Sequence, residues 1–372
     1  MRSGIVALVM SSLFVPCLPG SAQFPRGITS RIEKVEKVTD KLKDVELTPE
    51  EEVRLGEEIS SRIRTKYGVV QDPAVHKYVS LVGTVVARKS GSTMPFHFIV
   101  LDTDGVNAFA APGGFIHITR GALALVKDES QLAGVLAHEV AHVTQQHTIR
   151  AIQKGKVVQM AAKDRNVSSN PELFRRLTDE AYNIVFAGFG RADELDADTQ
   201  GFGFAVGAGY AGGGLGMFLA TLKERNGSSS QRQGLFASHP EMDERKQKLD
   251  AMVQSRSGDP GATLAERYTG NVKFQPVDLA QIAAVEAGAA GLAGETKKEE
   301  PKKKSRFSMA SLRNPLGTTE SSPQSAAVTG SGGSRGVDKE RLAKGGPNPA
   351  PVAVTLTEAE ITDFRTTGNL KA

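Results

Sequence analysis

His138, Glu139 and His142 are the residues of this sequence whose types and spacing point most clearly to chemistry. Two imidazoles four positions apart lie on one face of a helix, with Cβ atoms about 5–6 Å apart, so both can bind one tetrahedral ion. Glu139 follows the first histidine and can reach a water molecule that such an ion binds. This His-Glu-x-x-His pattern is typical of a zinc site that activates water for hydrolysis. The alternative is a chance match between two histidines on a helix surface.

The sequence around this pattern predicts the helix that such a site needs. Asp128 and Gln131 form a variant of the capping box, and the predicted helical stretch extends over residues 128–152. Its apolar residues recur three or four positions apart, namely Leu132, Val135, Leu136, Val140 and Val143. Because the motif and its predicted context agree, we interpret both histidines as metal ligands.

The start of the chain predicts export. A basic residue precedes an apolar run from Ile5 to Leu18, which is too short for a spanning helix, and Gly20-Ser21-Ala22 follows the run. We therefore predict a signal peptide over residues 1–22 and a soluble periplasmic protein without a transmembrane helix in its mature form. Cys17, the single cysteine, offers the alternative of a membrane-attached lipoprotein, although the proline before it fits a lipidation site poorly.

A hydrolytic zinc site also needs a third protein ligand and an open fourth position. A chain cleaved after Ala22 has no cysteine, so this ligand should be His, Asp or Glu. The acidic cluster at residues 193–198 is the densest downstream candidate, and its Glu194 and Asp198 share a helix face. One of them can bind the ion while the other accepts the free ring N–H of a ligand histidine. The alternative is a solvated acidic face near a helix N-terminus.

Further helices are predicted as the scaffold of this site. Residues 23–47 contain an amphipathic N-terminal helix that we expect to pack on the domain. Thr48-Pro49 and Asp72-Pro73 each begin a helix with a capping residue and a proline at the first helical position. Downstream of the motif, we predict helices at residues 171–187, from 190 past Phe204, at 215–225 and from 241 to about 253, with a loop at 226–238.

A small sheet is predicted before the motif. Residues 95–101, 106–111 and 114–119 read as strands, and the turn Pro112-Gly113-Gly114 predicts that the last two form a hairpin. Two of these strands each contain one histidine, and we interpret both as packed or surface residues rather than ligands; they are His97 and His117. The metal-binding domain should therefore occupy residues 48–256.

The last third of the chain has a different composition. Residues 280–294 are rich in Ala and Gly, residues 297–306 contain six Lys or Arg, and residues 317–350 have few large apolar side chains. Such a segment cannot bury enough surface to offset its ordering entropy. We predict a largely disordered tail at 257–372 that acts as a spacer, with a short ordered piece near 354–364. The net charge of +4 is small for this length and gives no reason to expect a nucleic-acid partner.

Several motifs in a fixed order make a family resemblance specific. They are Asn107 to Gly114, Thr119-Arg120-Gly121, His138 to His142, Arg191 to Asp198, and Ser238-His239-Pro240 with Arg245. Together they resemble the gluzincin metallopeptidases related to HtpX and the CAAX prenyl endopeptidases, in their soluble exported BepA-like branch. The resemblance covers roughly residues 48–253. It implies an α+β, mostly helical zincin-like domain with a small sheet bordering the active-site cleft.

The resemblance also implies roles for individual residues. Glu194 matches the third ligand of one Zn²⁺ ion, Asp198 and Arg245 match the groups that support the ligands, and Glu139 matches the general base. His239 matches a loop histidine that either caps the zinc in a resting state or assists catalysis, and the sequence does not separate these roles. An extended peptide is expected to lie along the edge strand formed by Asn107, Ala108, Phe109 and Ala110.

The expected function is a zinc endopeptidase that cleaves unfolded or misassembled exported proteins, with outer-membrane assembly machinery as a candidate partner. A zinc-stabilised, chaperone-like binding module with little proteolysis is the alternative. A third reading, cleavage of cell-wall peptide bridges, has no supporting feature. The chain departs from the resemblance in lacking the helical repeats of BepA-like proteins, and in having Asp196 where relatives often have glutamate. We expect no ligand role for Asp196.

Overall fold

The computed structural model describes residues 47–154, 170–226, 238–239, 242–257, 260–277 and 347–371. The expected signal peptide, nearly all of the expected N-terminal helix, most of the loop at 226–238 and residues 278–346 of the expected tail lie outside these residues. Within the described ranges, the structure contains no helix that combines the length and apolar character needed to cross a membrane.

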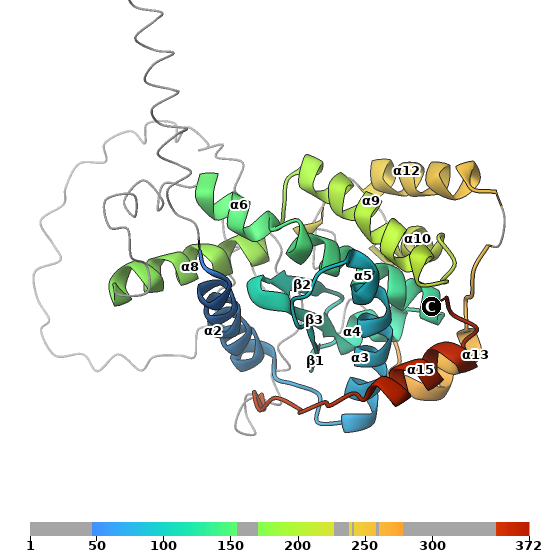
Figure 1. Cartoon of the computed structure of the whole chain (residues 1–372), viewed down its shortest axis with the longest axis horizontal. Helices are drawn as coiled ribbons and strands as arrows, with labels where there is room; N and C mark the ends of the chain where they lie inside the picture. Colours follow the sequence, from blue (N-terminus) through green and yellow to red (C-terminus); the bar gives the residue numbers. More distant parts are fainter. Residues whose placement is uncertain are drawn as a thin grey trace, which may run out of the picture.

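The described chain is mostly helical, with one small sheet, so the predicted α+β class is confirmed (Figure 1). The α-helices are α2 (Pro49–Tyr67), α3 (Pro73–Ala87), α4 (Arg120–Leu125), α5 (Glu129–Thr144), α6 (His147–Lys154), α8 (Pro171–Ala187), α9 (Arg191–Gly207), α10 (Gly214–Asn226), α12 (Met242–Ser255), α13 (Ala265–Asn271) and α15 (Glu358–Thr367). The strands are β1 (His97–Leu101), β2 (Ala108–Ala111) and β3 (Phe115–Thr119), and short 3₁₀ helices occupy η1 (Arg88–Ser90) and η2 (Pro112–Gly114).

Side-chain caps fix the starts of the helices that were predicted from sequence. Thr48 and Glu51 form a reciprocal capping box at α2, and Asp72 accepts hydrogen bonds from two backbone N–H groups of α3. Asp128 accepts from Gln131 N at 3.0 Å and so caps α5, the helix that carries the His-Glu-x-x-His pattern. Each cap satisfies backbone donors that a helix leaves unpaired at its first turn.

The sheet has the strand order β1-β3-β2. β2 and β3 pair antiparallel and are joined by η2, which confirms the predicted hairpin, while β1 pairs parallel to β3. Gly113 in this connection has a φ of 69°, a left-handed conformation that favours glycine. β2 is therefore an edge strand of the sheet.

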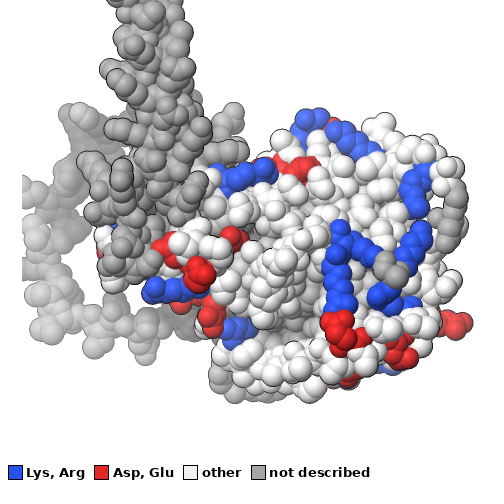
Figure 2. Space-filling model, in the orientation of Figure 1, with Lys and Arg blue, Asp and Glu red and all other residues white. Residues whose placement is uncertain are grey.

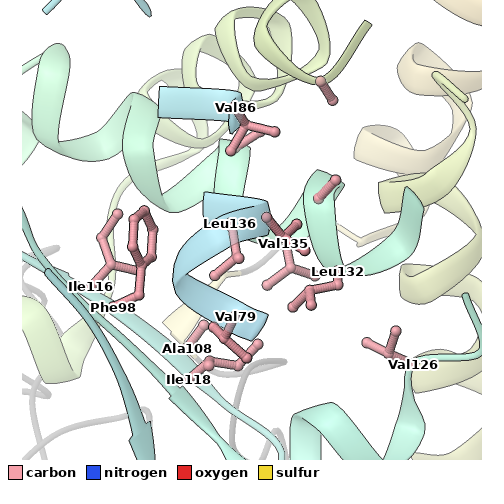
Figure 3. Close-up of a cluster of buried hydrophobic side chains, with 14 of the residues drawn as sticks. Val79, Val86, Phe98, Ala108, Ile116, Ile118, Val126, Leu132, Val135 and Leu136 are labelled. Carbon is pink, nitrogen blue, oxygen red and sulfur yellow. The ribbon is translucent and has the colours of Figure 1, made fainter. Parts of the chain in front are cut away.

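Alternating side chains of the sheet pack into two different hydrophobic cores. Ala108 and Ile118 face one core, in which the sheet packs against α3 and α5 (Figure 3). Phe109 and Ala111 face a second core, which lies between the sheet and helices α2 and α8. The figure shows Val79 of α3 close to Ala108 and Ile118 of the sheet. The metal-motif helix is thus held against one face of the sheet, and burial of its apolar residues fixes its position.

The helix predicted over residues 128–152 is interrupted, which corrects that expectation. α5 ends at Thr144, and α6 begins at His147 after Gln146, whose φ of 53° is left-handed. A non-glycine residue is uncommon in this conformation, and no Gly or Pro marks the break in the sequence. The break turns the chain directly after the second histidine of the motif.

Two segments beyond residue 256 pack on the domain, so the described domain extends past the expected boundary. α13 and α15 lie side by side near α3 (Figure 1), and the latter is the ordered piece expected near residues 354–364. Arg267 of α13 pairs with Glu129 at the start of α5. Basic and acidic side chains meet where α15 approaches α3 (Figure 2), in line with the ion pairs Arg88–Glu358 and Lys77–Glu360.

Candidate metal centre

Close packing of α5 against α9 brings the predicted ligands together. His138 and His142 come from α5 and Glu194 from α9, and His239 lies just before α12. Each of the four offers a ligand atom, and these atoms lie within 4.8 Å of one another. All four side chains are buried. The predicted set of two histidines and one downstream carboxylate is therefore assembled in space, with His239 as a fourth member.

The hydrogen bonds of His138 orient it for metal binding. Its Nδ1 lies 3.0 Å from Asp198 Oδ1, while its Nε2 lies 3.5 Å from Glu194 Oε2. A proton on Nδ1 that is donated to Asp198 leaves the Nε2 lone pair free for an ion. Asp198 thus occupies the supporting position expected from the sequence. Burial opposes a charge on His138, but hydrogen bonds to Asp198 and Glu194 raise its pKa to about 9, so metal binding must release a proton from it.

His142 is oriented by a residue that sequence reasoning missed. Its Nε2 lies 3.5 Å from Glu194 Oε1, and its Nδ1 lies 2.8 Å from Nδ1 of the fully buried His147. His147 Nε2 in turn lies 3.2 Å from Asp196 Oδ2. Asp196 can accept a hydrogen bond from Nε2–H of His147, and Nδ1 of His147 can then accept one from Nδ1–H of His142. In this arrangement the Nε2 lone pair of His142 is free for an ion. Asp196 therefore is not a member of the ligand cluster, but it contacts His142 indirectly, through His147.

Arg245 holds the two carboxylates of α9 in their charged form. Its guanidinium is buried and lies 2.8 Å from Glu194 Oε2 and 2.7 Å from Asp198 Oδ1. Burial raises the pKa of a carboxyl group, but the charges of His239 and Arg245 keep the pKa of Glu194 well below its usual range. Arg245 and His138 lower the pKa of Asp198 to about 2 despite its burial. Both carboxylates are therefore ionised at neutral pH, as a metal ligand and its hydrogen-bond acceptor must be.

Glu139 is a buried carboxylate beside the ligand cluster. The side chain is 1% exposed, and neither carboxylate oxygen has a hydrogen-bond partner among the described residues. Its Oε1 lies 3.8 Å from His239 Nε2, and burial raises its pKa. A buried carboxylate without a partner is costly, and such exceptions mark functional sites. A polarised water beside the ligand cluster would supply the missing hydrogen bond. The donor set of two imidazoles and a carboxylate is also one that Zn²⁺ binds in catalytic sites.

His239 contacts both helices that carry the other members of the cluster. Its Nδ1 lies 3.0 Å from both carboxylate oxygens of Glu194 and 3.3 Å from His138 Nε2. The preceding Ser238 donates a hydrogen bond to Asn107 Oδ1 at 3.3 Å, which ties this segment to the start of β2. His239 therefore lies where a fourth ligand would lie.

The expected substrate strand follows Asn107, which contacts Ser238 beside the ligand cluster, and its side chains are buried. Asn107 lies just before β2, and its Oδ1 accepts from Ala108 N at 2.9 Å. Phe109 points into the second core, where its ring lies 4.9 Å from that of Phe186. All four residues of β2 are at most 3% exposed, main chain included, so this conformation does not present the strand to a peptide.

The two strand histidines are packed residues. His117 is fully buried, with its Nε2 2.9 Å from Ser60 Oγ, and burial lowers its pKa to about 3. His97 stacks on Phe115 with ring centroids 4.8 Å apart. Neither belongs to the ligand cluster found among the described residues.

Comparison with known proteins agrees with this geometry. Residues 73–253 match Peptidase family M48. The chain is similar to the beta-barrel assembly-enhancing protease of Escherichia coli K12, with 25% identity over 205 residues, which are 51% of this chain and 41% of that protein. Metalloprotease YcaL of the same organism is 27% identical over 55% of this chain and 76% of its own length. Mitochondrial metalloendopeptidase OMA1 of Schizosaccharomyces pombe is 26% identical over 54% of this chain and 60% of its own length.

The matched residues include the whole ligand cluster. His138, Glu139, His142, Glu194 and His239 all lie within residues 73–253. The chain covers less than half the length of the beta-barrel assembly-enhancing proteases that it matches. The family resemblance expected from the ordered motifs is confirmed. Residues 73–253, which are just under half of the chain, resemble the metallopeptidases of peptidase family M48.

Proposed function

We propose that this protein is a zinc-dependent endopeptidase that cleaves unfolded or extended polypeptides in an exported compartment. The observation that carries the proposal is the buried carboxylate of Glu139, which has no hydrogen-bond partner among the described residues and lies beside His138, His142 and Glu194. A structural zinc site requires no base, whereas hydrolysis requires one at this position. The match of residues 73–253 to Peptidase family M48 supports the same conclusion.

The proposed roles follow from the positions of the side chains. A zinc ion bound at this site would supply Lewis acidity toward a scissile carbonyl and a water. His138, His142 and Glu194 would hold the ion through their inward-facing atoms. Glu139 Oε takes a proton from the attacking water and returns it to the leaving amine, and burial raises its pKa in the direction that favours this exchange. Asp198 and His147 hold the ligand imidazoles in the required tautomers.

We further propose that His239 acts as a removable fourth ligand rather than as a permanent part of the site. Its Nδ1 lies among the other ligand atoms, where it would occupy the position that hydrolysis needs open. The segment that carries it is tied to the domain by the hydrogen bond from Ser238 to Asn107. The described conformation would then be a resting state, and displacement of His239 would admit the substrate.

The substrate class is proposed from the edge strand. A peptide that adds to β2 pairs through its main chain, so only an unfolded or extended segment can bind in this way. The relatives named beta-barrel assembly-enhancing proteases suggest that the substrates include misassembled outer-membrane proteins. The proposed periplasmic location rests on the signal peptide predicted over residues 1–22.

The position of His239 also favours a second candidate function. A permanently bound fourth ligand would leave a zinc-stabilised module that holds unfolded chains and cleaves little. Digestion of casein by the zinc-loaded full chain, with and without a chelator, separates the two functions. We expect chelator-sensitive cleavage that increases in His239→Ala. Absence of cleavage in both proteins, with retained binding of casein, would favour the binding module.

A further inference from the structure

Phe189 lies against the metal centre, but the roles proposed above do not include it. It belongs to the connection between α8 and α9 and directly precedes Gly190, the N-cap residue of α9. Its ring stacks on the imidazole of His142, with ring centroids 4.2 Å apart and ring planes that differ by 19°. Phe189 is 8% exposed, so this contact is shielded from solvent. The phenyl ring therefore covers one face of a proposed metal ligand.

The parallel arrangement distinguishes Phe189 from the other rings that surround His142. The imidazoles of His138, His147 and His239 have centroids 4.6–5.6 Å from that of His142, and their planes are tilted against it by 57–83°. The phenyl ring instead presents its face, where the negative part of the aromatic quadrupole lies. His142 thus has an electron-rich surface on one side of its ring.

The backbone around Phe189 holds the ring in this position. Gly188 has a φ of 81°, and its N–H group donates to Ile184 O at 3.0 Å, which ends α8. A Cβ atom at position 188 would lie 1.7 Å from the carbonyl oxygen of Ser238, so the connection packs closely on that segment. The ring of Phe189 also lies 5.8 Å from that of His147. Phe189 therefore cannot turn away from His142 unless its neighbours move.

The contact should become stronger when His142 binds a metal ion. An imidazole that shares its Nε2 lone pair with a divalent cation takes up part of the positive charge, which is then the largest local charge in the site. A positive charge within about 6 Å of an aromatic face is attracted to that face, most strongly where water is excluded. An interaction that is stronger in the metal-bound state than in the metal-free state increases the affinity for the metal.

We propose that Phe189 is a positioning residue of the metal centre, whose π-face fixes the plane of the His142 imidazole and raises the affinity of the site for zinc. Phe189 acts through the ring of His142 and not on the reacting atoms. The inference rests on the metal centre of the proposed function and adds a residue outside its donor set. An aliphatic side chain could fill the same space, but it has no π-face.

The test varies the charge on the ring face while the shape of the ring is kept. Amber suppression places 4-fluoro-, 3,5-difluoro- or pentafluorophenylalanine at position 189 of the full chain, and competition with a chromogenic chelator measures zinc affinity. We expect the affinity to fall in the order of fluorination, by about tenfold for the pentafluoro ring, because its face is no longer negative. Urea unfolding of the metal-free chains should differ little across the series, since the packing is nearly unchanged.

Phe186 provides the matched control. It lies in the last turn of α8, and its ring packs 4.9 Å from that of Phe109 instead of on a metal ligand. The same fluorinated series at position 186 should leave zinc affinity within about twofold of the unmodified chain. Phe189→Leu, which removes the π-face altogether, should also weaken zinc binding.

The result separates this inference from the proposed function. Zinc affinity that is equal across the series at position 189, or that falls as much at position 186, would overturn the role of Phe189 and leave the metal centre intact. A folded chain that binds no zinc in any form would overturn both. Dependence of zinc affinity on fluorination at position 189 alone, in a chain that does not digest casein, would support the role of Phe189 and reject the endopeptidase.

Discussion

Gly201 of α9 packs directly on the backbone of His138 in α5. A Cβ atom at position 201 would lie 2.8 Å from the backbone nitrogen of His138 and 3.0 Å from the carbonyl of Ala137. This close approach places Asp198 and Glu194, about one and two turns earlier in α9, beside the imidazole of His138. The metal centre therefore depends on a glycine that has no chemical role of its own.

Gly201→Ala should weaken metal binding and destabilise the domain. The added methyl group must push α9 away from α5, and overpacking of this kind costs about 1–3 kcal/mol. The separation also moves Glu194 away from His138 and His142. Urea unfolding of the metal-free chain and competition with a chromogenic chelator measure the two effects.

Gly203→Ala is the control for this prediction. Gly203 lies on the same helix, and a Cβ atom there would meet nothing within 4 Å. Alanine should therefore stabilise α9 by about 0.5–1 kcal/mol through its lower unfolded-state entropy, and metal affinity should not change. Equal effects of the two substitutions would contradict the packing argument.

Glu139→Gln should bind metal like the unmodified chain but lose proteolysis. The amide has nearly the shape of the carboxylate and leaves the ligand atoms in place, but it cannot accept a proton. Loss of a general base lowers turnover by about 100-fold or more. Metal analysis and casein digestion of the same preparation measure both properties, and turnover at the unmodified level would rule out Glu139 as the base.

His147→Phe should lower metal affinity without preventing folding. Phenylalanine can keep the packing of His147 near Phe189, where the ring centroids lie 5.8 Å apart, but it offers no acceptor to His142 Nδ1. Loss of such a hydrogen bond to a metal ligand weakens binding by about 10–100-fold. Chelator competition measures the affinity directly.

The matched control for His147→Phe is His97→Phe, which replaces a histidine that stacks on Phe115 away from the ligand cluster. We expect no change in metal affinity from it. Asp196→Asn should weaken binding in the same direction as His147→Phe, because it removes the charged acceptor of His147. Unchanged affinity in both His147→Phe and Asp196→Asn would show that the His142–His147–Asp196 chain does not support the site.

The buried His117 should make the domain less stable as pH falls. Burial lowers its folded-state pKa to about 3, below the usual 6.5, so below pH 6.5 the unfolded chain binds a proton that the folded chain does not. Its contribution to stability is complete above pH 6.5 and is lost progressively towards pH 3. Between pH 6 and 4 the slope should be about 1.4 kcal/mol per pH unit.

His117→Gln isolates this effect, because glutamine can hydrogen-bond to Ser60 but does not titrate. The difference between the urea stabilities of the two proteins cancels the other titrating groups. That difference should depend on pH below 6.5 and be constant above it. A constant difference from pH 7 to 4 would mean that His117 does not remain neutral in the folded state.

Local signals made much of the fold predictable. Thr48, Asp72 and Asp128 cap helices at the positions expected from sequence, because capping needs only residues within one turn. The β2–β3 hairpin was predictable for the same reason. The parallel pairing of β1 with β3 and the packing of α13 depend on contacts between distant residues, which no local pattern encodes.

The site was predictable where its residues share a helix face. His138 with His142, and Glu194 with Asp198, are each four positions apart. His147 follows His142 by five positions, which in a continuous helix would place it about 140° around the axis. The break at Gln146 brings it back to His142, and nothing in the sequence marks that break. A histidine so close to the motif was the one available signal.

The most direct test of the metal centre is metal analysis combined with zinc K-edge X-ray absorption, applied to the full chain purified without chelator. We predict a single bound zinc ion per chain, nitrogen and oxygen ligands at about 2.0–2.2 Å with no sulfur, and loss of the ion in His138→Ala and Glu194→Ala. A pure, folded chain that holds no metal and takes up none, or whose metal survives both substitutions, would contradict the account.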